Sequence, residues 1–370
     1  MIRKVCAFIW FLFIILSCVN ENNVIGRGDG FKYARNISID RVGNFRVATL
    51  VSPWDSSKVL HRYVLVDRKD SAIASEMPDG TALYIPFDRA VVFSSPHVSL
   101  AFSLGAGNRI AGIADKEYIV SPVVKTGIDR LKVMDCGASL SPDIEKIISL
   151  TPDAIFVTPY ENSGGYGIIE EAGVPLVECA DYMETSALGR AEWMRFYGIL
   201  FGKEREADSL FCIVESEYQR LSEQARTASS HPSVITERVM GGTWYVPGGN
   251  SSMAHAIIDA GGSYPFSPDT HRGSLPKSVE EVLDKAGESD VWLFNVMDDD
   301  ISYESIGSEN DAYRMMRAWR ERNIWTVNTL SVPYFDDISF RPDLLLRDLV
   351  AIVHPELGNG KTIYYRKVTK

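Results

Sequence analysis

Two distant stretches of the chain carry the same local pattern, a short amphipathic helix followed by an apolar strand. The first is 141–148 leading into 153–157, and the second is 278–283 leading into 290–294. In each, a serine precedes the helix, a glutamate lies in its first turn and an aspartate precedes the strand. A helix that alternates with a buried strand is typical of α/β architecture. Two such units in matching contexts predict a chain built from two similar α/β lobes.

The glutamates of these two units are Glu145 and Glu280. The positive end of the helix dipole favours a carboxylate in the first turn by about 0.3 to 1 kcal/mol, so helix stability alone would explain both residues. Their equivalent positions in the two halves also suit a shared functional role.

The length of the chain fits two lobes better than one core, since 370 residues exceed the size at which a single core stops growing. Apolar residues make up 45% and charged residues 24%, an ordinary balance for a globular protein. The formal charge is -11, and no cluster of lysine and arginine stands out. Nucleic acid is therefore not expected as a partner.

The N-terminal segment is typical of a targeting sequence. Two basic residues precede an apolar run, 7–16, that is too short to span a bilayer, and Cys18 follows almost at once. Residues 15–18 resemble a bacterial lipobox, which implies a lipoprotein signal peptide over 1–17 and acylation of Cys18, and hence a membrane anchor. The alternative is a plain signal peptide with an incidental cysteine.

The remaining cysteines and the histidines predict no metal site made by protein side chains. Cys136, Cys179 and Cys212 show neither C-x-x-C spacing nor a neighbouring histidine, so we interpret them as small buried residues. The six histidines are scattered, without an i, i+4 pair. A metal would arrive inside an organic chelate, and no cofactor is expected.

The pattern of strands and helices divides the chain further. Two strands, 45–51 and 63–66, predict a β-rich region. Strand then alternates with helix, beginning with a strand over 90–93 and a helix over 98–104. Between the lobes, one apolar face recurs at three- and four-residue steps and predicts a helix of about 30 Å. The predicted parts are 18–85 as tether and β-rich extension, 86–183 as the first α/β lobe, 184–228 as linking helices and 229–370 as the second lobe.

Nine short motifs carry a family resemblance. In chain order they are 92–96, 100–107, 109–113, 145–153, 173–175, 246–248, 259–262, 278–283 and 354–356. Their order resembles that of the periplasmic substrate-binding proteins that serve ABC importers of iron-siderophore, haem and cobalamin. This family implies two Rossmann-like lobes joined by a long rigid helix, with the ligand in the cleft between the lobes.

The resemblance also assigns roles to the two glutamates. In this family one glutamate on each lobe pairs with arginines of the membrane permease, and these glutamates match Glu145 and Glu280, with Glu281 as an alternative for the second. Some relatives carry a glutamate inside the first helix, where this chain has Ser99.

Candidate ligand contacts follow the strands, because ligands of open α/β sheets lie beyond the carboxyl ends of the strands. Aromatic rings there would offer flat apolar area to a chelate. The candidates are Ser95, His97, Tyr160 and Tyr182 on the first lobe, and Trp244, Tyr245, Asn295, His271 and Arg272 on the second. The resemblance adds Asp336 and Arg341. Rim packing would equally explain the aromatics, and His97 would serve equally as a helix cap.

We therefore expect a substrate-binding lipoprotein that delivers an iron complex, a siderophore chelate or haem, to the permease and ATPase of an ABC importer. Cobalamin is an alternative ligand, and a stand-alone surface lipoprotein that captures haem or cobalamin is an alternative function. An enzyme is the least favoured class, because the chain lacks G-x-S-x-G, P-loop, G-x-G-x-x-G and H-E-x-x-H motifs. The mildly acidic sequence after Cys18 favours a periplasmic location at the inner membrane over the cell surface.

Overall fold

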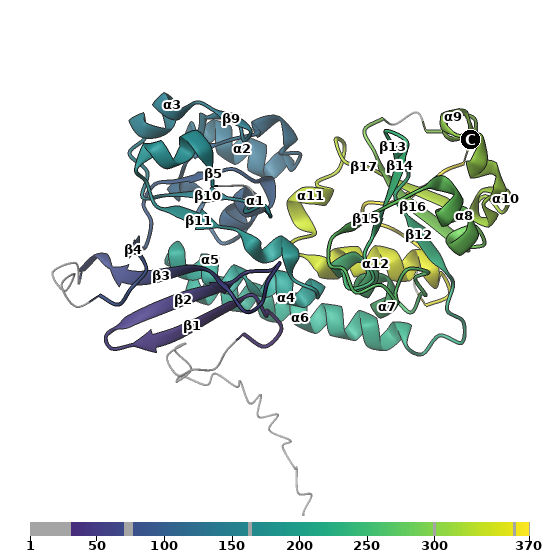
Figure 1. Cartoon of the computed structure of the whole chain (residues 1–370), viewed down its shortest axis with the longest axis horizontal. Helices are drawn as coiled ribbons and strands as arrows, with labels where there is room; N and C mark the ends of the chain where they lie inside the picture. The colour runs from purple at the N-terminus through teal and green to yellow at the C-terminus, as the bar shows by residue number, and fades with distance from the viewer. Residues whose placement is uncertain (1–30, 70–76, 162–164, 299–300, 358–359, 370) are drawn as a thin grey trace, which may run out of the picture.

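Two α/β lobes lie side by side above a long helix, and a small β-sheet lies under the first lobe (Figure 1). The computed structural model describes residues 31–69, 77–161, 165–298, 301–357 and 360–369. The signal peptide, Cys18 and the start of the predicted tether lie outside these residues. Within the described part, no helix is long and apolar enough to cross a membrane.

The N-terminal extension is a four-stranded sheet rather than the two strands expected. Its strands, in the order β1-β2-β3-β4, are β1 Ile37–Val42, β2 Phe45–Val51, β3 Val59–Asp67 and β4 Thr81–Ile85. Neighbouring strands are antiparallel except β3 and β4, which run parallel. The apolar residues of β2 and β3 bury this sheet against the first lobe, because Leu50, Tyr63 and Leu65 belong to the main core.

The first lobe is built on a parallel sheet in the order β11-β10-β5-β6-β7. The central strands are apolar throughout and fully buried, as expected when helices cover both faces of a parallel sheet. Its elements are β5 Ala90–Val92, α1 Ser95–Ser103, β6 Ile110–Ile113, α2 Pro122–Leu131, β7 Met134–Asp135, β8 Gly137–Ala138, β9 Ser141–Pro142, α3 Ile144–Ser149, β10 Ala154–Val157 and β11 Leu176–Glu178.

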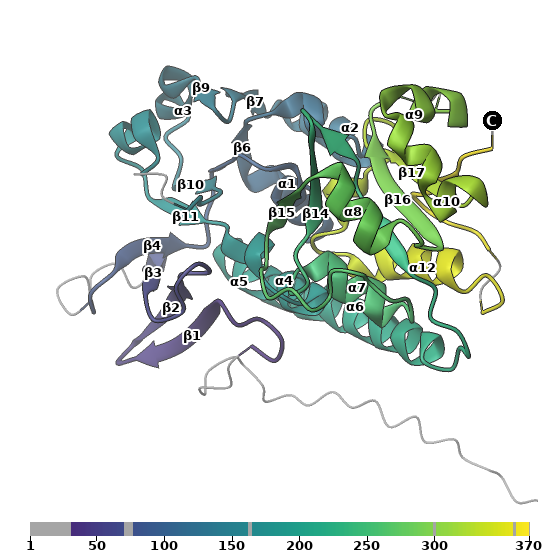
Figure 2. The ribbon, with the colours of Figure 1, turned by 45° about the vertical axis from the view of Figure 1, so that its right-hand side comes forward.

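Three helices link the lobes, namely α4 Ala187–Glu192, α5 Met194–Leu200 and α6 Glu204–Ala225. Gly202 separates α5 from α6 in a left-handed conformation, φ +64°, which glycine adopts at little cost. Helix α6 has 22 residues and runs beneath both lobes in Figures 1 and 2. The predicted long linking helix is therefore present.

The second lobe has a sheet in the order β12-β16-β17-β18, parallel except for β18, and a small antiparallel sheet, β13-β14-β15. Its helix α12 packs lengthwise on α6 (Figure 2). Its elements are β12 Val234–Thr236, β13 Val239–Met240, β14 Thr243–Pro247, α7 Ser252–Asp259, β15 Ser274–Lys277, α8 Val279–Ala286, β16 Val291–Val296, α9 Tyr303–Glu309, α10 Arg317–Arg320, β17 Ile324–Asn328, α11 Tyr334–Asp337, α12 Pro342–Val353 and β18 Arg366–Lys367.

The lobes also meet directly, at the short helix α11 of the second lobe. It packs against α1 of the first lobe, and the ring of Phe340 lies 5.4 Å from that of His97. Asp336 of α11 reaches across the junction, where its Oδ2 accepts the backbone N–H groups of Val120 at 2.9 Å and Ser121 at 2.7 Å. The two lobes are therefore held together at two places, along α6 and through α11.

Two helix starts differ from the sequence prediction. Helix α1 begins at Ser95 instead of 98, with Pro96 in its first turn, where proline is well tolerated. Asp143, not Ser141, caps helix α3, because its carboxylate accepts the N–H of Lys146 at 3.0 Å while Ser141 pairs in the β8-β9 hairpin. The two repeated units are therefore similar in order but capped differently.

Candidate ligand-binding site

A pocket of about 450 Å³ opens at the carboxyl edge of the first lobe's sheet. Strand β5 comes first in the chain, β6 and β7 follow on one side of it, and β10 and β11 follow on the other. The order in which strands are added therefore reverses between β5 and β10, which is the switch point of the sheet. Ligands of open α/β sheets bind at such a point. The pocket is lined by Phe93, Ser94, Ser95, Pro96, Asp115, Tyr118, Ser139, Leu140, Val157, Thr158, Tyr160, Gly165, Tyr166 and Ile169.

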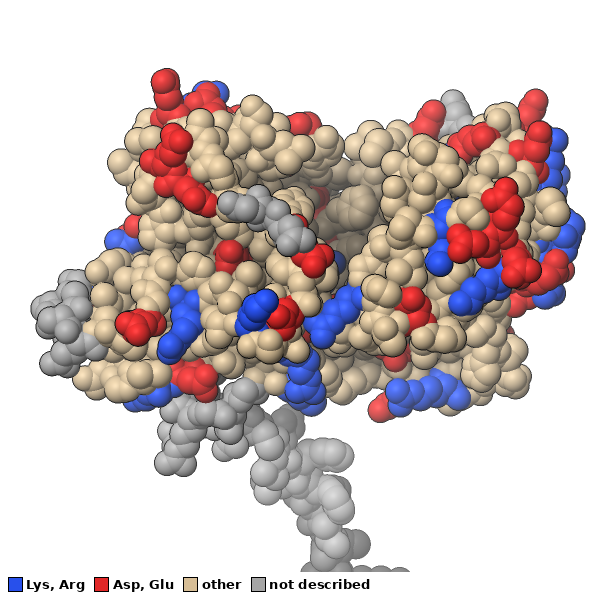
Figure 3. Space-filling model, viewed as in Figure 1, with Lys and Arg blue, Asp and Glu red and all other residues tan. Residues whose placement is uncertain are grey.

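The wall of this pocket offers hydroxyls and aromatic rings. None of the described residues that line it is a lysine, arginine or histidine. Asp115 is the one carboxylate among the described lining residues, and it accepts the N–H of Ser139 at 2.9 Å. In the space-filling view, the hollow between the lobes is likewise bordered largely by uncharged atoms (Figure 3). The first lobe therefore suits the apolar and hydroxyl-bearing parts of a ligand better than an anionic group.

Two of the four first-lobe candidates, Ser95 and Tyr160, line the pocket, and the side chain of Tyr160 is 59% exposed. Tyr182 does not line the pocket, and its hydroxyl donates to the carbonyl of Pro159 at 2.7 Å. Burial, together with the nearby Tyr160, raises the pKa of Tyr182 to about 12, so the hydroxyl keeps its proton at neutral pH. Tyr118 and Tyr166 also line the pocket, but the sequence did not single them out, because they lie several residues beyond the ends of β6 and β10.

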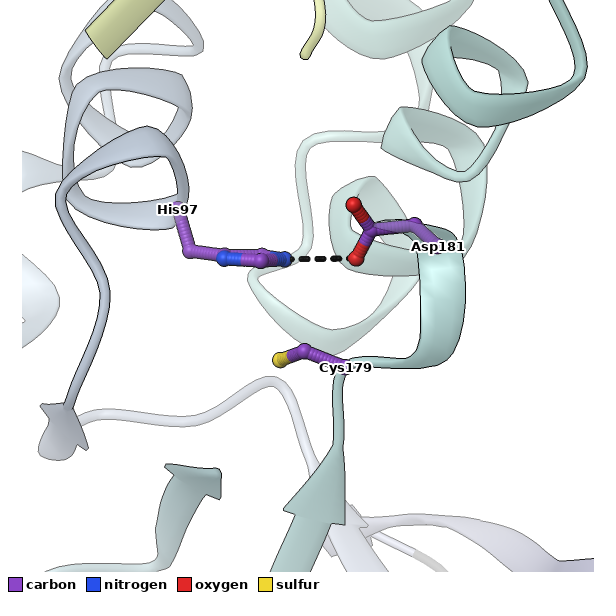
Figure 4. A group of neighbouring side chains, drawn as sticks. All are labelled: His97, Cys179 and Asp181. Carbon is purple, nitrogen blue, oxygen red and sulfur yellow. Dashed lines mark hydrogen bonds and ion pairs between the residues drawn. The ribbon is translucent and has the colours of Figure 1, made fainter. Parts of the chain in front are cut away.

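His97 lies in the core and does not line the pocket. Its Nε2 is 2.8 Å from Asp181 Oδ1 (Figure 4). The same nitrogen is 3.1 Å from the hydroxyl of Tyr197, and Nδ1 contacts the Ser94 hydroxyl. Burial disfavours a charged imidazole, but Cys179 and Asp181 together raise the pKa of His97 to about 10. Burial alone would raise the pKa of Asp181. The charge of His97 outweighs it and lowers the pKa of Asp181 to about 2.

His97, Cys179 and Asp181 form the one group of potential metal ligands found in the described part of the chain, with ligand atoms within 4.8 Å of one another (Figure 4). The direct His97–Asp181 hydrogen bond occupies the atoms that a metal would use, and Arg190 lies 3.4 Å from the same carboxylate. This arrangement fits a buried ion pair better than a cation site. It braces the start of α1, whose first residues line the pocket.

The second-lobe candidates separate into core and surface. Trp244 is fully buried and its indole N–H donates to the carbonyl of Thr236 at 3.0 Å, so we do not retain it as a ligand contact. Its neighbour Tyr245 is 46% exposed, because successive residues of a strand point to opposite faces. Asn295 is half-buried on β16.

The remaining charged candidates are tied to protein groups. Asp336 is only 3% exposed and bonds across the lobe junction, and Arg341 forms a two-point pair with Asp343 at 2.9 and 2.7 Å. His271 is exposed and pairs with Asp269 at 3.0 Å, while Arg272 contacts Asn36 of the extension at 3.4 Å. Of these four, only Asp336 has a buried oxygen, Oδ1, without a hydrogen-bond partner in the described structure.

The two glutamates predicted to dock on a permease are both exposed, in the first turns of α3 and α8. Within the described residues, the carboxylates of Glu145 and Glu280 make no hydrogen bond or ion pair. Glu281 differs, because it closes a capping box in which it accepts the N–H of Ser278 at 2.8 Å. The structure therefore favours Glu280 over Glu281 as the carboxylate that is free to bind a partner.

A larger cavity, of about 570 Å³, lies in the second lobe. It is lined by residues that precede β12, β16 and β17, among them Pro232, Asp290 and Asn323, and so lies at the amino ends of the strands. That edge is opposite to the one at which open α/β sheets bind ligands. We therefore take the pocket of the first lobe as the candidate site.

Comparison with known proteins agrees with the fold. Residues 91–328 match the family described as periplasmic binding protein. An uncharacterized lipoprotein of Methanocaldococcus jannaschii is 25% identical over 362 residues, covering 90% of this chain and 84% of the relative. A molybdate-binding protein of Haemophilus influenzae is 22% identical over 64% of this chain and 70% of its own length.

Among solved structures, a periplasmic heme binding protein from Pseudomonas aeruginosa superposes with a TM-score of 0.59 at 19% sequence identity. The match covers 77% of this chain and 99% of that protein. The predicted architecture of two α/β lobes on a helical backbone, with an N-terminal sheet, is thereby confirmed.

Proposed function

The chain belongs to the periplasmic binding protein family, and we propose that it captures an iron complex, a siderophore chelate or haem, and delivers it to the permease and ATPase of an ABC importer. Members of this family are solute-binding proteins rather than enzymes. The observation that carries the proposal is the pocket at the switch point of the first lobe's sheet. Cobalamin is the alternative ligand, and capture without an importer is the alternative function.

The lining of the pocket supports an organic chelate over a free oxyanion. Aromatic rings such as those of Tyr118 and Tyr160 offer flat apolar area, and hydroxyls such as that of Ser95 offer orienting hydrogen bonds. Oxyanions are normally bound by arginine, lysine or clustered N–H groups, and none of the described residues of the wall is an arginine or a lysine. We therefore do not extend molybdate binding from the Haemophilus relative to this chain.

Binding is tested by titrating the full chain with hemin, ferrichrome, cyanocobalamin and molybdate, followed by calorimetry and by quenching of tryptophan fluorescence. We expect one of the three organic complexes to bind with a dissociation constant below about 1 µM, about 8 kcal/mol, and molybdate not to bind. If none of the three binds, or if only molybdate does, the proposed ligand class is wrong.

Delivery is proposed to depend on Glu145 and Glu280, whose exposed carboxylates lack partners within the described structure and are suited to two-point pairs with arginine. Replacing both with alanine should leave ligand affinity unchanged and abolish uptake in cells. The matched control is Glu281→Ala, which removes a neighbouring carboxylate but should preserve uptake. Normal uptake by the double variant would exclude this docking role.

For the location, we propose a lipid anchor at Cys18 that holds the protein at the periplasmic face of the inner membrane rather than at the cell surface. The Methanocaldococcus relative is itself named a lipoprotein. Replacing Cys18 with alanine should release the protein from membrane pellets into the soluble fraction. Membrane retention of this variant would contradict the anchor.

A further inference from the structure

The N-terminal sheet covers the free edge of the first lobe's sheet. Strand β11 is the edge strand, and the hydroxyl of Tyr63 on β3 donates to the carbonyl of Leu176 at 3.0 Å and accepts the N–H of Glu178 at 2.9 Å. One buried hydroxyl thus satisfies two backbone groups that an edge strand would otherwise leave unpaired. The extension is therefore joined to β11 at an atomic contact.

A second contact runs from the same strand to the side chain of Glu178. The ring of His61 stacks on that of Tyr63, with centroids 4.3 Å apart, and its Nε2 is 2.8 Å from the Thr81 hydroxyl of β4. Its other nitrogen, Nδ1, lies 3.4 Å from Glu178 Oε2, an ion-pair distance when the imidazole is protonated. Glu178 is 8% exposed, so the extension supplies one close neighbour, His61, of a buried carboxylate.

The other oxygen of Glu178 contacts a residue of the pocket wall. Its Oε1 accepts the hydroxyl of Tyr166 at 2.7 Å, and Tyr166 is one of the residues that line the pocket. Burial and the Glu178 carboxylate raise the pKa of Tyr166 well above its ordinary value, so the phenol keeps the proton that it donates. Contacts therefore run without a break from β3 of the extension to the wall of the pocket.

We propose that the N-terminal sheet contributes to the ligand site. His61 and Tyr63 of this sheet, together with Glu178 of β11, act as positioning residues for Tyr166. This inference rests on the proposed function for the identification of the pocket as a ligand site. Tyr166 precedes a short 3₁₀ helix, Gly167–Ala172, a segment outside the sheet. A hydrogen bond to a buried carboxylate restricts the ring to one position before a ligand arrives, which lowers the entropy cost of binding.

The first test is a double-mutant cycle on ligand affinity, with whichever of hemin, ferrichrome and cyanocobalamin saturates the wild type. Glu178→Gln should weaken binding about tenfold, and Tyr63→Phe and His61→Phe each about threefold, as for coupled neighbouring residues. In a Tyr166→Phe background these losses should disappear, because the hydroxyl through which the residues act is absent. The matched control is Arg62→Ala, an exposed neighbour on β3, which should bind normally.

The second test needs no ligand. With 3-fluorotyrosine at position 166 of the full chain, the fluorine resonance should shift in Glu178→Gln and in Tyr63→Phe and stay in place in Arg62→Ala. If none of the three complexes binds the wild type, the proposed function fails while the resonance still decides whether the extension positions Tyr166. An unshifted resonance, or equal losses of affinity with and without the Tyr166 hydroxyl, would overturn the inference.

Discussion

The N-terminal strap and the lobe junction are both held by buried carboxylates that accept backbone N–H groups, but the strap has more of these hydrogen bonds. By strap we mean residues 32–36, which precede β1. In the strap, the buried carboxylates of Glu192 and Glu184 accept five consecutive backbone N–H groups: Glu192 those of residues 32–34 at 2.7 to 2.9 Å, and Glu184 those of 35 and 36 at 2.9 to 3.0 Å. At the lobe junction, Asp336 accepts two N–H groups and keeps one buried oxygen without a hydrogen-bond partner in the described structure.

This difference indicates how each junction behaves. Hydrogen bonds to a charged acceptor each contribute about 1.5 to 3 kcal/mol, so the strap carries several such contributions and the lobe junction fewer. Glu184 is bonded further, to the indole N–H of Trp193 at 2.9 Å, and Arg195 pairs with Glu192 at 3.1 Å. The extension is thus fixed to the linking helices by more of these hydrogen bonds than join the lobes at Asp336.

The largest expected effect is at the strap. Glu192→Ala removes the acceptor of three buried or half-buried N–H groups and should lower the free energy of unfolding by about 3 to 5 kcal/mol. Urea denaturation followed by circular dichroism measures the change. Glu223→Ala, an exposed carboxylate on α6, is the matched control and should change stability by less than about 0.5 kcal/mol. A loss below 1 kcal/mol for Glu192→Ala would remove the basis of the comparison.

Another buried carboxylate tests whether the number of accepted N–H groups sets the strength of such a junction. Buried Asp348 of α12 accepts the N–H groups of residues 363–365 at 2.6 to 3.0 Å and so holds the C-terminal segment. Asp348→Ala should cost about 3 kcal/mol in the same denaturation experiment, between the strap and the lobe junction. Asp284→Ala, on the exposed face of α8, serves as the control. A cost equal to that of Asp336→Ala would mean that the number of accepted N–H groups does not set the strength of such junctions.

The His97–Asp181 pair near the lobe junction predicts a pH dependence. The pKa of His97 is raised to about 10, so its contribution is complete below pH 6.5, the ordinary histidine value, and is lost as the pH rises through 10. The pKa of Asp181 is lowered to about 2, so its contribution is complete above pH 3.8 and is lost as the pH falls toward 2. The window between pH 3.8 and 6.5 should therefore give the full stabilisation by this pair.

Between pH 7 and 10 we expect the free energy of unfolding to fall by about 2 to 3 kcal/mol, measured by urea denaturation at each pH. His97→Gln should be less stable at pH 6 and should lose this alkaline slope. An unchanged slope in that variant would mean that other groups cause the alkaline loss of stability and that the His97–Asp181 pair does not contribute to it.

The smallest expected effect is at the lobe junction itself. Asp336→Ala should lower the free energy of unfolding by only about 1 to 2 kcal/mol, because two N–H groups lose their acceptor while the lobes remain joined along α6. Small-angle X-ray scattering should show a wider spread of lobe separations than in the wild type. Glu117→Ala, an exposed carboxylate that shortly precedes Val120, is the control. A loss as large as that of Glu192→Ala would show that the two junctions are equally strong.

Local sequence patterns determined much of this protein. The strictly apolar runs of β5 and β10 and the repeating apolar face of α6 predicted the lobes and the linking helix, because the spacing of apolar residues fixes which element buries them. Ser95 and Tyr160 were predicted as site residues because positions after parallel strands meet at one edge of the sheet.

Only the tertiary structure decided how distant residues meet. Glu184 and Glu192 lie in ordinary helical sequence, and nothing local indicates that they bind a strap about 150 residues earlier in the chain. The same holds for Glu178, which joins Tyr166 to His61, and for Trp244, whose side chain faces the core while that of Tyr245 faces outward. A periodic pattern records which face of an element is buried, but hydrogen bonds between remote segments depend on packing that no local pattern contains.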